Sequence, residues 1–359
     1  MRMKSFLSFL LVVFLFVPIP ASSDDEPLIG QLRETFQKEY LSVGILLQTV
    51  ADFQAERTMP GFNGFNISNF RLKIFGELDK SFGYFVQANF INLPGLLDAK
   101  LYYRFSDQFM IDGGMFKAPF SKEFLISADA IDFVNRSRVV SVLAPGRQIG
   151  LQARGRLDPG VQVDYNVGIF NGNSYGGNSN DNNDFLYATR FAFFPLFTSK
   201  ESADQMEIGA NIMYSKDDLA PVSSLLNPFV YDALFFTGKR TIYGFDIRYT
   251  SGDFLISGEY LNGNFSGTFY FLAADTSVGS ARPEGFHLTA GYMLSRNVQL
   301  LGRWDKFRSD SGSDNPDWAL IGLNFWPTQV SELQLNYLIN TRNNAFKYHQ
   351  VLINAQIAF

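Results

Sequence analysis

Basic residues gather in one stretch of this otherwise acidic chain. Residues 65–157 hold twelve Lys and Arg against eight Asp and Glu, a net charge of +4, whereas the whole chain has a formal net charge of −5. Positive charges that line a low-dielectric passage attract anions and repel cations, so these side chains could guide anions. The candidate anion-binding residues are Arg71, Lys73, Lys100, Arg104, Lys117, Lys122, Arg136, Arg138, Arg147, Arg154 and Arg156.

The same cations could instead serve a structural purpose. The stretch also holds carboxylates that could pair with them as salt bridges, namely Asp98, Asp112, Glu123, Asp129 and Asp132. The sequence does not separate the two interpretations for any single residue. For the stretch as a whole, the excess of cations favours anion guidance.

Alternating polar and apolar residues predict the strands that carry six of these cations. Arg71 and Lys73 alternate with Phe70, Leu72 and Ile74, so the two cations share one face of a strand. The same alternation puts Lys100, Arg104, Arg154 and Arg156 on the polar faces of later strands. It continues to the end of the chain, where apolar residues occupy every second position from Val351 to Phe359.

About sixteen such segments follow one another, and the connections between them are alternately short and long. This pattern predicts an all-β fold, a transmembrane antiparallel β-barrel of about sixteen strands whose polar face lines a water-filled lumen. Aromatic residues make up 16% of the chain, with 38 Phe and 16 Tyr, although its mean hydropathy is only −0.02. A soluble β-sandwich or propeller would explain neither the alternating connections nor the aromatic residues at strand ends.

The longest connection, residues 117–146, is unusually apolar for a surface loop. It contains Phe120, Phe124, Leu125, Ile126, Ile131, Phe133 and Val139. Because such side chains must be packed against something, we expect this extracellular loop to fold inward onto the barrel wall. Its cations, together with Arg147, would then line a constriction.

The N-terminus has the pattern of a secretory signal. Arg2 and Lys4 precede an apolar run from Phe6 to Val17, and small residues follow at 21–23. The run is shorter than the roughly 20 residues that a membrane-spanning helix needs, although an uncleaved anchor is the alternative. We therefore expect a signal peptide at 1–23, a periplasmic lead-in at 24–39 and the barrel at 40–359, in the bacterial outer membrane. The lead-in could form a short helix through Leu28, Leu32 and Phe36 or could be disordered.

A resemblance to a known family lies at the start of the long connection. The run Gly113–Ser121, GGMFKAPFS, resembles the strand-end G-x-x-K-x-P-F-S signature of the phosphate-selective porin O and P family. The segments Phe65–Gly76, Phe133–Ser137 and Leu143–Gly150 are also similar in order and spacing. The resemblance implies a sixteen-stranded, usually trimeric outer-membrane channel for anions. It also implies that the inward-folded third loop forms the narrowest point, near Lys117, Lys122, Arg136, Arg138 and Arg147.

We predict a passive diffusion channel for small anions such as phosphate or polyphosphate, which catalyses no reaction and uses no cofactor. Expected partners are outer-membrane lipid, lipopolysaccharide and two further copies of the chain, with no nucleic acid. The family's arginine ladder is thin here, because Arg154 and Arg156 form its longest run. Two alternatives stay open: a general or weakly cation-selective porin, and a plugged barrel whose loops have an adhesive or structural role.

The composition predicts no metal site. The chain has no cysteine, and its two histidines, His287 and His349, are far apart in sequence. By strand parity His287 faces the lumen, and His349 lies near the outer end of the last strand. We interpret both as ordinary polar residues.

Overall fold

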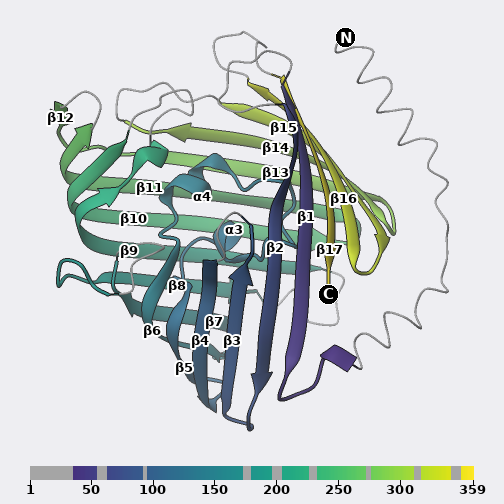
Figure 1. Cartoon of the computed structure of the whole chain (residues 1–359), viewed down its shortest axis with the longest axis horizontal. Coiled ribbons are helices and arrows are strands. Elements are labelled where there is room, and N and C mark those ends of the chain that lie inside the picture. Colours follow the sequence, from purple (N-terminus) through teal and green to yellow (C-terminus); the bar gives the residue numbers. More distant parts are fainter. Residues whose placement is uncertain are drawn as a thin grey trace.

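The computed structural model of the chain is a closed ring of antiparallel strands (Figure 1). It describes residues 35–54, 63–91, 95–172, 179–195, 204–225, 233–271, 276–310, 317–340 and 349–359. The predicted signal peptide and most of the predicted lead-in, including Leu28 and Leu32, lie outside these ranges. Sixteen strands make the ring, and a three-residue strand, β12 (Thr276–Val278), pairs with one of them.

The strands follow one another around the ring in chain order. The first eight are β1 (Ser42–Gln54), β2 (Gly64–Glu77), β3 (Phe82–Asn89), β4 (Gly95–Ser106), β5 (Phe109–Lys117), β6 (Arg147–Leu157), β7 (Gln162–Phe170) and β8 (Leu186–Phe194). The others are β9 (Gln205–Pro221), β10 (Leu234–Ser251), β11 (Phe254–Phe271), β13 (Glu284–Ser295), β14 (Val298–Arg308), β15 (Trp318–Thr328), β16 (Ser331–Asn340) and β17 (His349–Ala358). Strands on opposite sides cross in Figure 1, because barrel strands tilt relative to the barrel axis.

Pairing of the first and last strands closes the ring. β1 and β17 are antiparallel from Leu46 opposite Ala358 to Gln54 opposite Gln350. Ile45 and Phe359 add two backbone hydrogen bonds of 3.0 and 3.1 Å. Closure leaves no open sheet edge, which is the condition for a β structure to survive in lipid. The predicted sixteen-stranded antiparallel barrel is therefore confirmed.

The two faces of the ring differ as the alternating pattern requires. Leu151 and Ile321 point outward and are each 56% exposed, whereas the polar Gln152, next to Leu151, and Asn324, three residues after Ile321, are 8% and 1% exposed. Outward aromatic residues such as Phe105 and Phe254 lie beside the short turns that join β4 to β5 and β10 to β11. The apolar outer face is suited to lipid and the polar inner face to water.

The connections also alternate in length. β4 and β5 are joined by two residues and β10 and β11 by two residues, whereas residues 118–146 join β5 to β6. That long connection contains two short helices, α3 (Lys122–Leu125) and α4 (Arg138–Leu143). A one-turn 3₁₀ helix, η1 (Ser223–Leu225), follows β9.

None of the helices in the described ranges is long and apolar enough to cross a membrane.

Gly114 gives a direct test of how tightly β4 and β5 approach each other. Its φ is +126°, and a Cβ atom there would lie 2.1 Å from the carbonyl oxygen of Ala99 on the neighbouring strand. Backbone cannot move aside easily, so Gly114→Ala should destabilise the barrel by about 1–3 kcal/mol. Gly302→Ala is the control, because the nearest atom there is 4.0 Å away. Thermal loss of the β-sheet circular dichroism signal measures both; equal midpoints would contradict the expectation.

Candidate functional site

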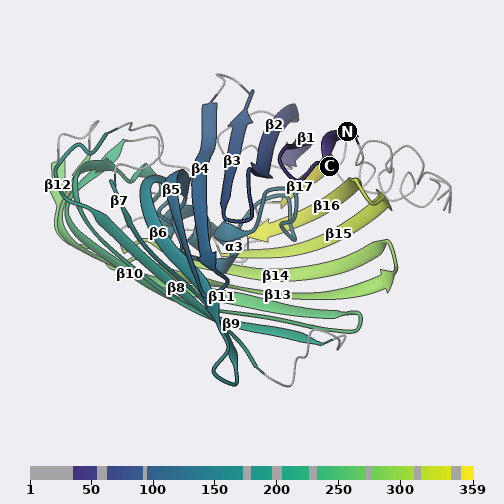
Figure 2. The ribbon, with the colours of Figure 1, turned by 90° about the horizontal axis from the view of Figure 1, so that it is seen from below.

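The long connection between β5 and β6, residues 118–146, is called the inner loop here because it contacts the polar inner face of the ring. The Gln48 side chain donates to Ala128 O at 3.1 Å, and Gln334 donates to Ile131 O at 3.1 Å. Further polar contacts reach β2, β10, β11, β14, β15 and β17. The loop thus bonds to strands on opposite sides of the barrel, and in Figure 2 α3 lies between them.

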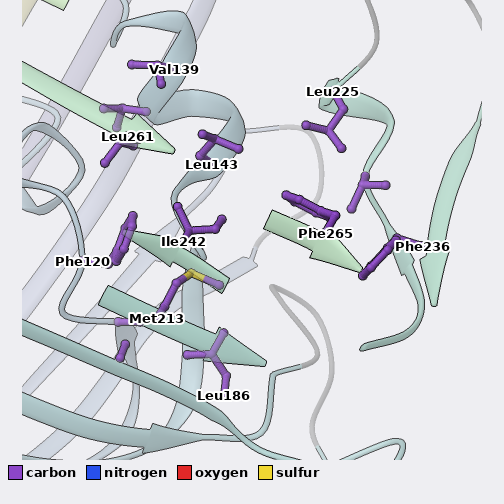
Figure 3. Close-up of a cluster of buried hydrophobic side chains, with 14 of the residues drawn as sticks. Phe120, Val139, Leu143, Leu186, Met213, Leu225, Phe236, Ile242, Leu261 and Phe265 are labelled. Atoms are coloured by element: carbon purple, nitrogen blue, oxygen red, sulfur yellow. The ribbon is translucent and has the colours of Figure 1, made fainter. Parts of the chain in front are cut away.

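Apolar packing accounts for the composition of the inner loop. Phe120, Val139 and Leu143 are at most 2% exposed and pack against Met213, Ile242 and Leu261 of the wall (Figure 3). A second buried cluster joins Phe133 to wall residues that include Leu301, Leu320 and Leu352. Burying one such side chain is worth about 1.5–3 kcal/mol, so these clusters hold the loop in place.

A buried carboxylate fastens the loop on its other side. Glu123 lies 2.8 Å from the guanidinium of Arg303 on β14 and accepts two hydrogen bonds from Ser137, at 2.9 Å from its amide and 2.6 Å from its hydroxyl. Burial alone would raise the pKa of Glu123, but the charge of Arg303 and the Ser137 hydrogen bonds outweigh it and lower the pKa to about 2. Glu123 is therefore ionised at neutral pH.

Between residues that the structure describes, seven of the eleven predicted cations form ion pairs with carboxylates. The pairs are Lys73–Asp129 (3.2 Å), Lys100–Asp112 (3.3 Å), Arg104–Glu77 (3.0 Å), Lys122–Glu207, Arg147–Asp98 (3.1 Å), Arg154–Asp112 (2.8 Å) and Arg156–Asp164 (2.7 Å). The structural interpretation therefore applies to these seven. Arg104 and Arg156 pair beside the short turns and do not contact the inner loop in these interactions.

The other four predicted cations bond to neutral groups. Lys117 donates to Phe124 O at 2.6 Å and Ile126 O at 2.8 Å, and Arg136 donates to Glu123 O at 3.0 Å and Ile126 O at 2.6 Å. Arg138 donates to Ser224 O at 2.6 Å and lies over the ring of Phe307. Arg71 donates to Asn69 Oδ1 at 2.7 Å. Within the described part of the chain, Arg71, Lys117 and Arg136 form no ion pair with a carboxylate.

These three cations and Arg147 form a group of positive charges. Arg71 is close enough to Arg136 and Arg147 for their charges to repel, and Lys117 interacts with all three. The nearby carboxylates are Asp98, Asp129 and Glu123, which pair with Arg147, Lys73 and Arg303 respectively. The group is called the cation cluster below, and Arg147 is its one member that forms an ion pair with a described carboxylate.

An open cavity adjoins the cation cluster. It has a volume of about 460 Å³ and lies between the inner loop and the wall formed by β1, β2 and β17. Arg71 and Arg136 both line it, and Asp52 is its one carboxylate among the described residues. The remaining polar lining consists of amide and hydroxyl side chains, including Asn66, Ser68, Asn69, Asn135, Ser141 and Asn354.

Sequence analysis missed the inward cations of the second half of the barrel. Arg190 on β8 lies 2.6 Å from Asp246 and 2.8 Å from Glu207, and Arg248 on β10 lies 2.9 Å from Asp132 of the inner loop. Strand parity could have identified Arg248, because it alternates with the apolar Ile247 and Tyr249. The acidic residues elsewhere in that half of the chain offset the charge of Arg248 in the regional net charge.

The two histidines lie where their strands predict. His287 is 5% exposed, and its Nε2 lies 3.7 Å from Glu123 under the inner loop. His349 begins β17, and its Nδ1 lies 2.6 Å from the Tyr337 hydroxyl. Neither belongs to a cluster of metal-ligating side chains in the residues that the structure describes.

Comparison with solved structures finds the same fold at low identity. An anion-selective porin from Comamonas acidovorans matches with a TM-score of 0.58 and 12% identity over 89% of this chain and 99% of that one. OmpF of Salmonella typhi, in a complex with daunomycin, matches with a TM-score of 0.59 and 11% identity, covering 89% and 97%. The outer membrane channel DcaP of Acinetobacter baumannii gives 0.55 and 12%, covering 90% and 99%.

No curated protein matches this chain in sequence. The model of the family described as phosphate-selective porin O and P does match, over residues 48–224. The matched region runs from β1 to η1 and includes the GGMFKAPFS motif, the inner loop and the whole cation cluster. Over residues 48–224 the chain therefore matches the phosphate-selective porin O and P family, and its barrel has the fold of an outer-membrane porin.

Proposed function

We propose that this porin conducts small anions past the cation cluster, with the inner loop forming its narrowest point. The observation that carries the proposal is that Arg71 and Arg136 line one open cavity without a carboxylate partner among the described residues. A permeating anion there would meet two guanidinium groups that form no ion pair with a described carboxylate. Because the ion crosses down its own gradient, raising its local concentration is sufficient to favour it.

Phosphate is a candidate substrate within this proposal. The family is described by its phosphate selectivity, and a guanidinium group can bind phosphate through two parallel hydrogen bonds. A structural relative from Comamonas acidovorans is described as anion-selective. Four other cations contribute less to anion binding in this proposal, because each would have to leave its carboxylate partner to bind an anion. They are Lys73, Lys100, Arg147 and Arg154.

The proposal also covers the export, location and assembly of the protein. Residues 1–23 would be removed on export, residues 24–39 would lie in the periplasm, and the barrel would assemble as a homotrimer in contact with lipopolysaccharide. The exposed apolar outer face supports contact with lipid, and part of it could face neighbouring copies.

The reversal potential in a KCl gradient tests the proposed function. Purified full-length protein in a planar bilayer should give discrete current steps and a potential that favours chloride. Inorganic phosphate added to one side should compete with the chloride current. A potential that favours potassium would overturn anion selectivity and leave a general porin, and folded protein without any steps would indicate a plugged barrel.

A further inference from the structure

A continuous row of amide side chains runs along the barrel wall beside Arg71, and three of its members, Asn69, Gln48 and Asn354, line the cavity. Arg71 donates to Asn69 at 2.7 Å, Asn69 donates to Gln48, and Gln48 donates to Gln356. Asn354 continues the row, donating to Gln356 at 3.3 Å and to Gln334 at 3.0 Å. The row thus begins at a cation of the cluster and crosses β2, β1, β17 and β16.

Strand register creates this row. Gln48 is directly opposite Asn69 on one side and Gln356 on the other, and Gln334 is opposite Asn354. The β1–β2 pairing slips between Gln48 and Thr49, which leaves Ser68 as an extra residue on β2. A bulge of this kind redirects side chains, and both Ser68 and Asn69 accordingly line the cavity.

Several of these polar groups have capacity for a ligand. The Asn354 Oδ1 atom is buried and accepts no hydrogen bond from any described residue. The side chains of Asn66, Ser68, Asn135 and Ser141 line the same cavity, and no hydrogen bond joins them to the rest of the described structure. An inorganic anion, which needs only the two arginines, would leave these groups to water.

Hydroxyl groups match this lining. An amide presents two donors and an acceptor, and a hydroxyl presents one donor and two acceptors, so the two can pair in either direction. A polyol chain with one anionic group would place that group at Arg71 and Arg136 and its hydroxyls beside the free side chains of the lining. Asp52, farther along β1, would accept from a distant hydroxyl and would disfavour a second negative charge there.

We propose that the cavity is a binding site for small polyhydroxylated anions, such as sugar acids and sugar phosphates, which the channel would admit in preference to inorganic anions. The site rests on the proposed anion channel and specifies its substrate class. Two sets of residues supply its two features. Arg71 and Arg136 supply the charge, and the free amide and hydroxyl side chains of the lining, Asn66, Ser68, Asn135 and Ser141, supply hydroxyl recognition. The cavity volume of about 460 Å³ leaves room for one such solute.

Block of the single-channel chloride current tests this site. Gluconate and glucose 6-phosphate should each reduce the current at concentrations at least about tenfold lower than inorganic phosphate or glucose. Block by only one of the two would identify carboxylate or phosphate as the preferred anionic group. If inorganic phosphate blocks as well as both, the polyol site is overturned while anion conduction stands.

Substitution of the free side chains locates the effect. The double variant Asn66→Ala/Asn135→Ala removes no hydrogen bond between described residues, so the barrel should fold normally. It should weaken block by gluconate about tenfold relative to block by phosphate. Asn297→Ala, at the exposed turn between β13 and β14, is the control and should not change the ratio. An unchanged ratio in the double variant would show that the polyol binds elsewhere and would refute the assignment.

Discussion

The double variant Arg71→Glu/Arg136→Glu should reverse the ion preference of the channel from chloride to potassium. Each exchange alters the local charge by two units, and the charge lining the cavity would change from two cations and one carboxylate to three carboxylates. Two unit charges 4 Å apart interact by about 1 kcal/mol in water and about 4 kcal/mol at an effective dielectric constant of 20. Because 1.4 kcal/mol corresponds to a factor of ten, the chloride-to-potassium permeability ratio should fall at least about tenfold.

The reversal potential in a salt gradient measures this change, and its sign should invert. Lys80→Glu is the control, since it introduces the same two-unit charge change as each single exchange, but at an exposed turn between β2 and β3. It should leave the sign unaltered. If the double variant keeps its anion preference although circular dichroism shows an intact barrel, the cation cluster does not control selectivity.

Removing the Glu123 carboxylate should release the inner loop from the wall. In Glu123→Ala the guanidinium of Arg303, whose side chain is only 2% exposed, would lose its carboxylate partner. Breaking a buried pair in this way costs about 3–5 kcal/mol. Undocking of the loop relieves that cost without breaking the strand pairing, so we expect a larger and noisier single-channel conductance in a barrel that retains its β-sheet signal.

A second variant separates the effect of the unpaired buried charge from the effect of lost side-chain packing. Glu123→Ala/Arg303→Met removes both charges and should recover part of the lost docking, because neither partner is then left buried alone. Protease cleavage within residues 118–146 provides an independent measure: the single variant should be cut faster than the unmodified protein, and the double variant at an intermediate rate. A single variant with unaltered conductance and cleavage would mean that apolar packing alone holds the loop.

The barrel could be predicted from sequence because, within each strand, apolar residues that face lipid alternate with polar residues that face water. Phe70 and Leu72 face outward and Arg71 and Lys73 face inward whatever strand lies beside them, so alternation within β2 was enough. The inner loop was predictable for a similar reason. Side chains such as Phe120 and Phe133 must be buried, and the nearest surface for a loop of that length is the barrel wall.

The pairing of charges could not be predicted, because it depends on the register between strands and on the path of the loop. Lys100 and Arg154 share Asp112 only because β4 and β6 flank β5 in that register. A net charge counted over a region also conceals cations that local acids balance, which is why Arg190 and Arg248 were missed. Conversely, the carbonyl partners of Lys117 and Arg136 have no signature in the sequence.

The contacts of the inner loop also have a consequence for the order of assembly. Several of its partners on the wall come much later in the chain, such as Arg248, 116 residues after Asp132, and Gln356, 227 residues after Asp129. Contacts between such distant residues form slowly, because the intervening chain must first be ordered. Residues 118–146 can therefore complete their docking only after β17 has joined β1. Each newly closed barrel should therefore pass through a short-lived stage in which its pore is wide and does not select between ions.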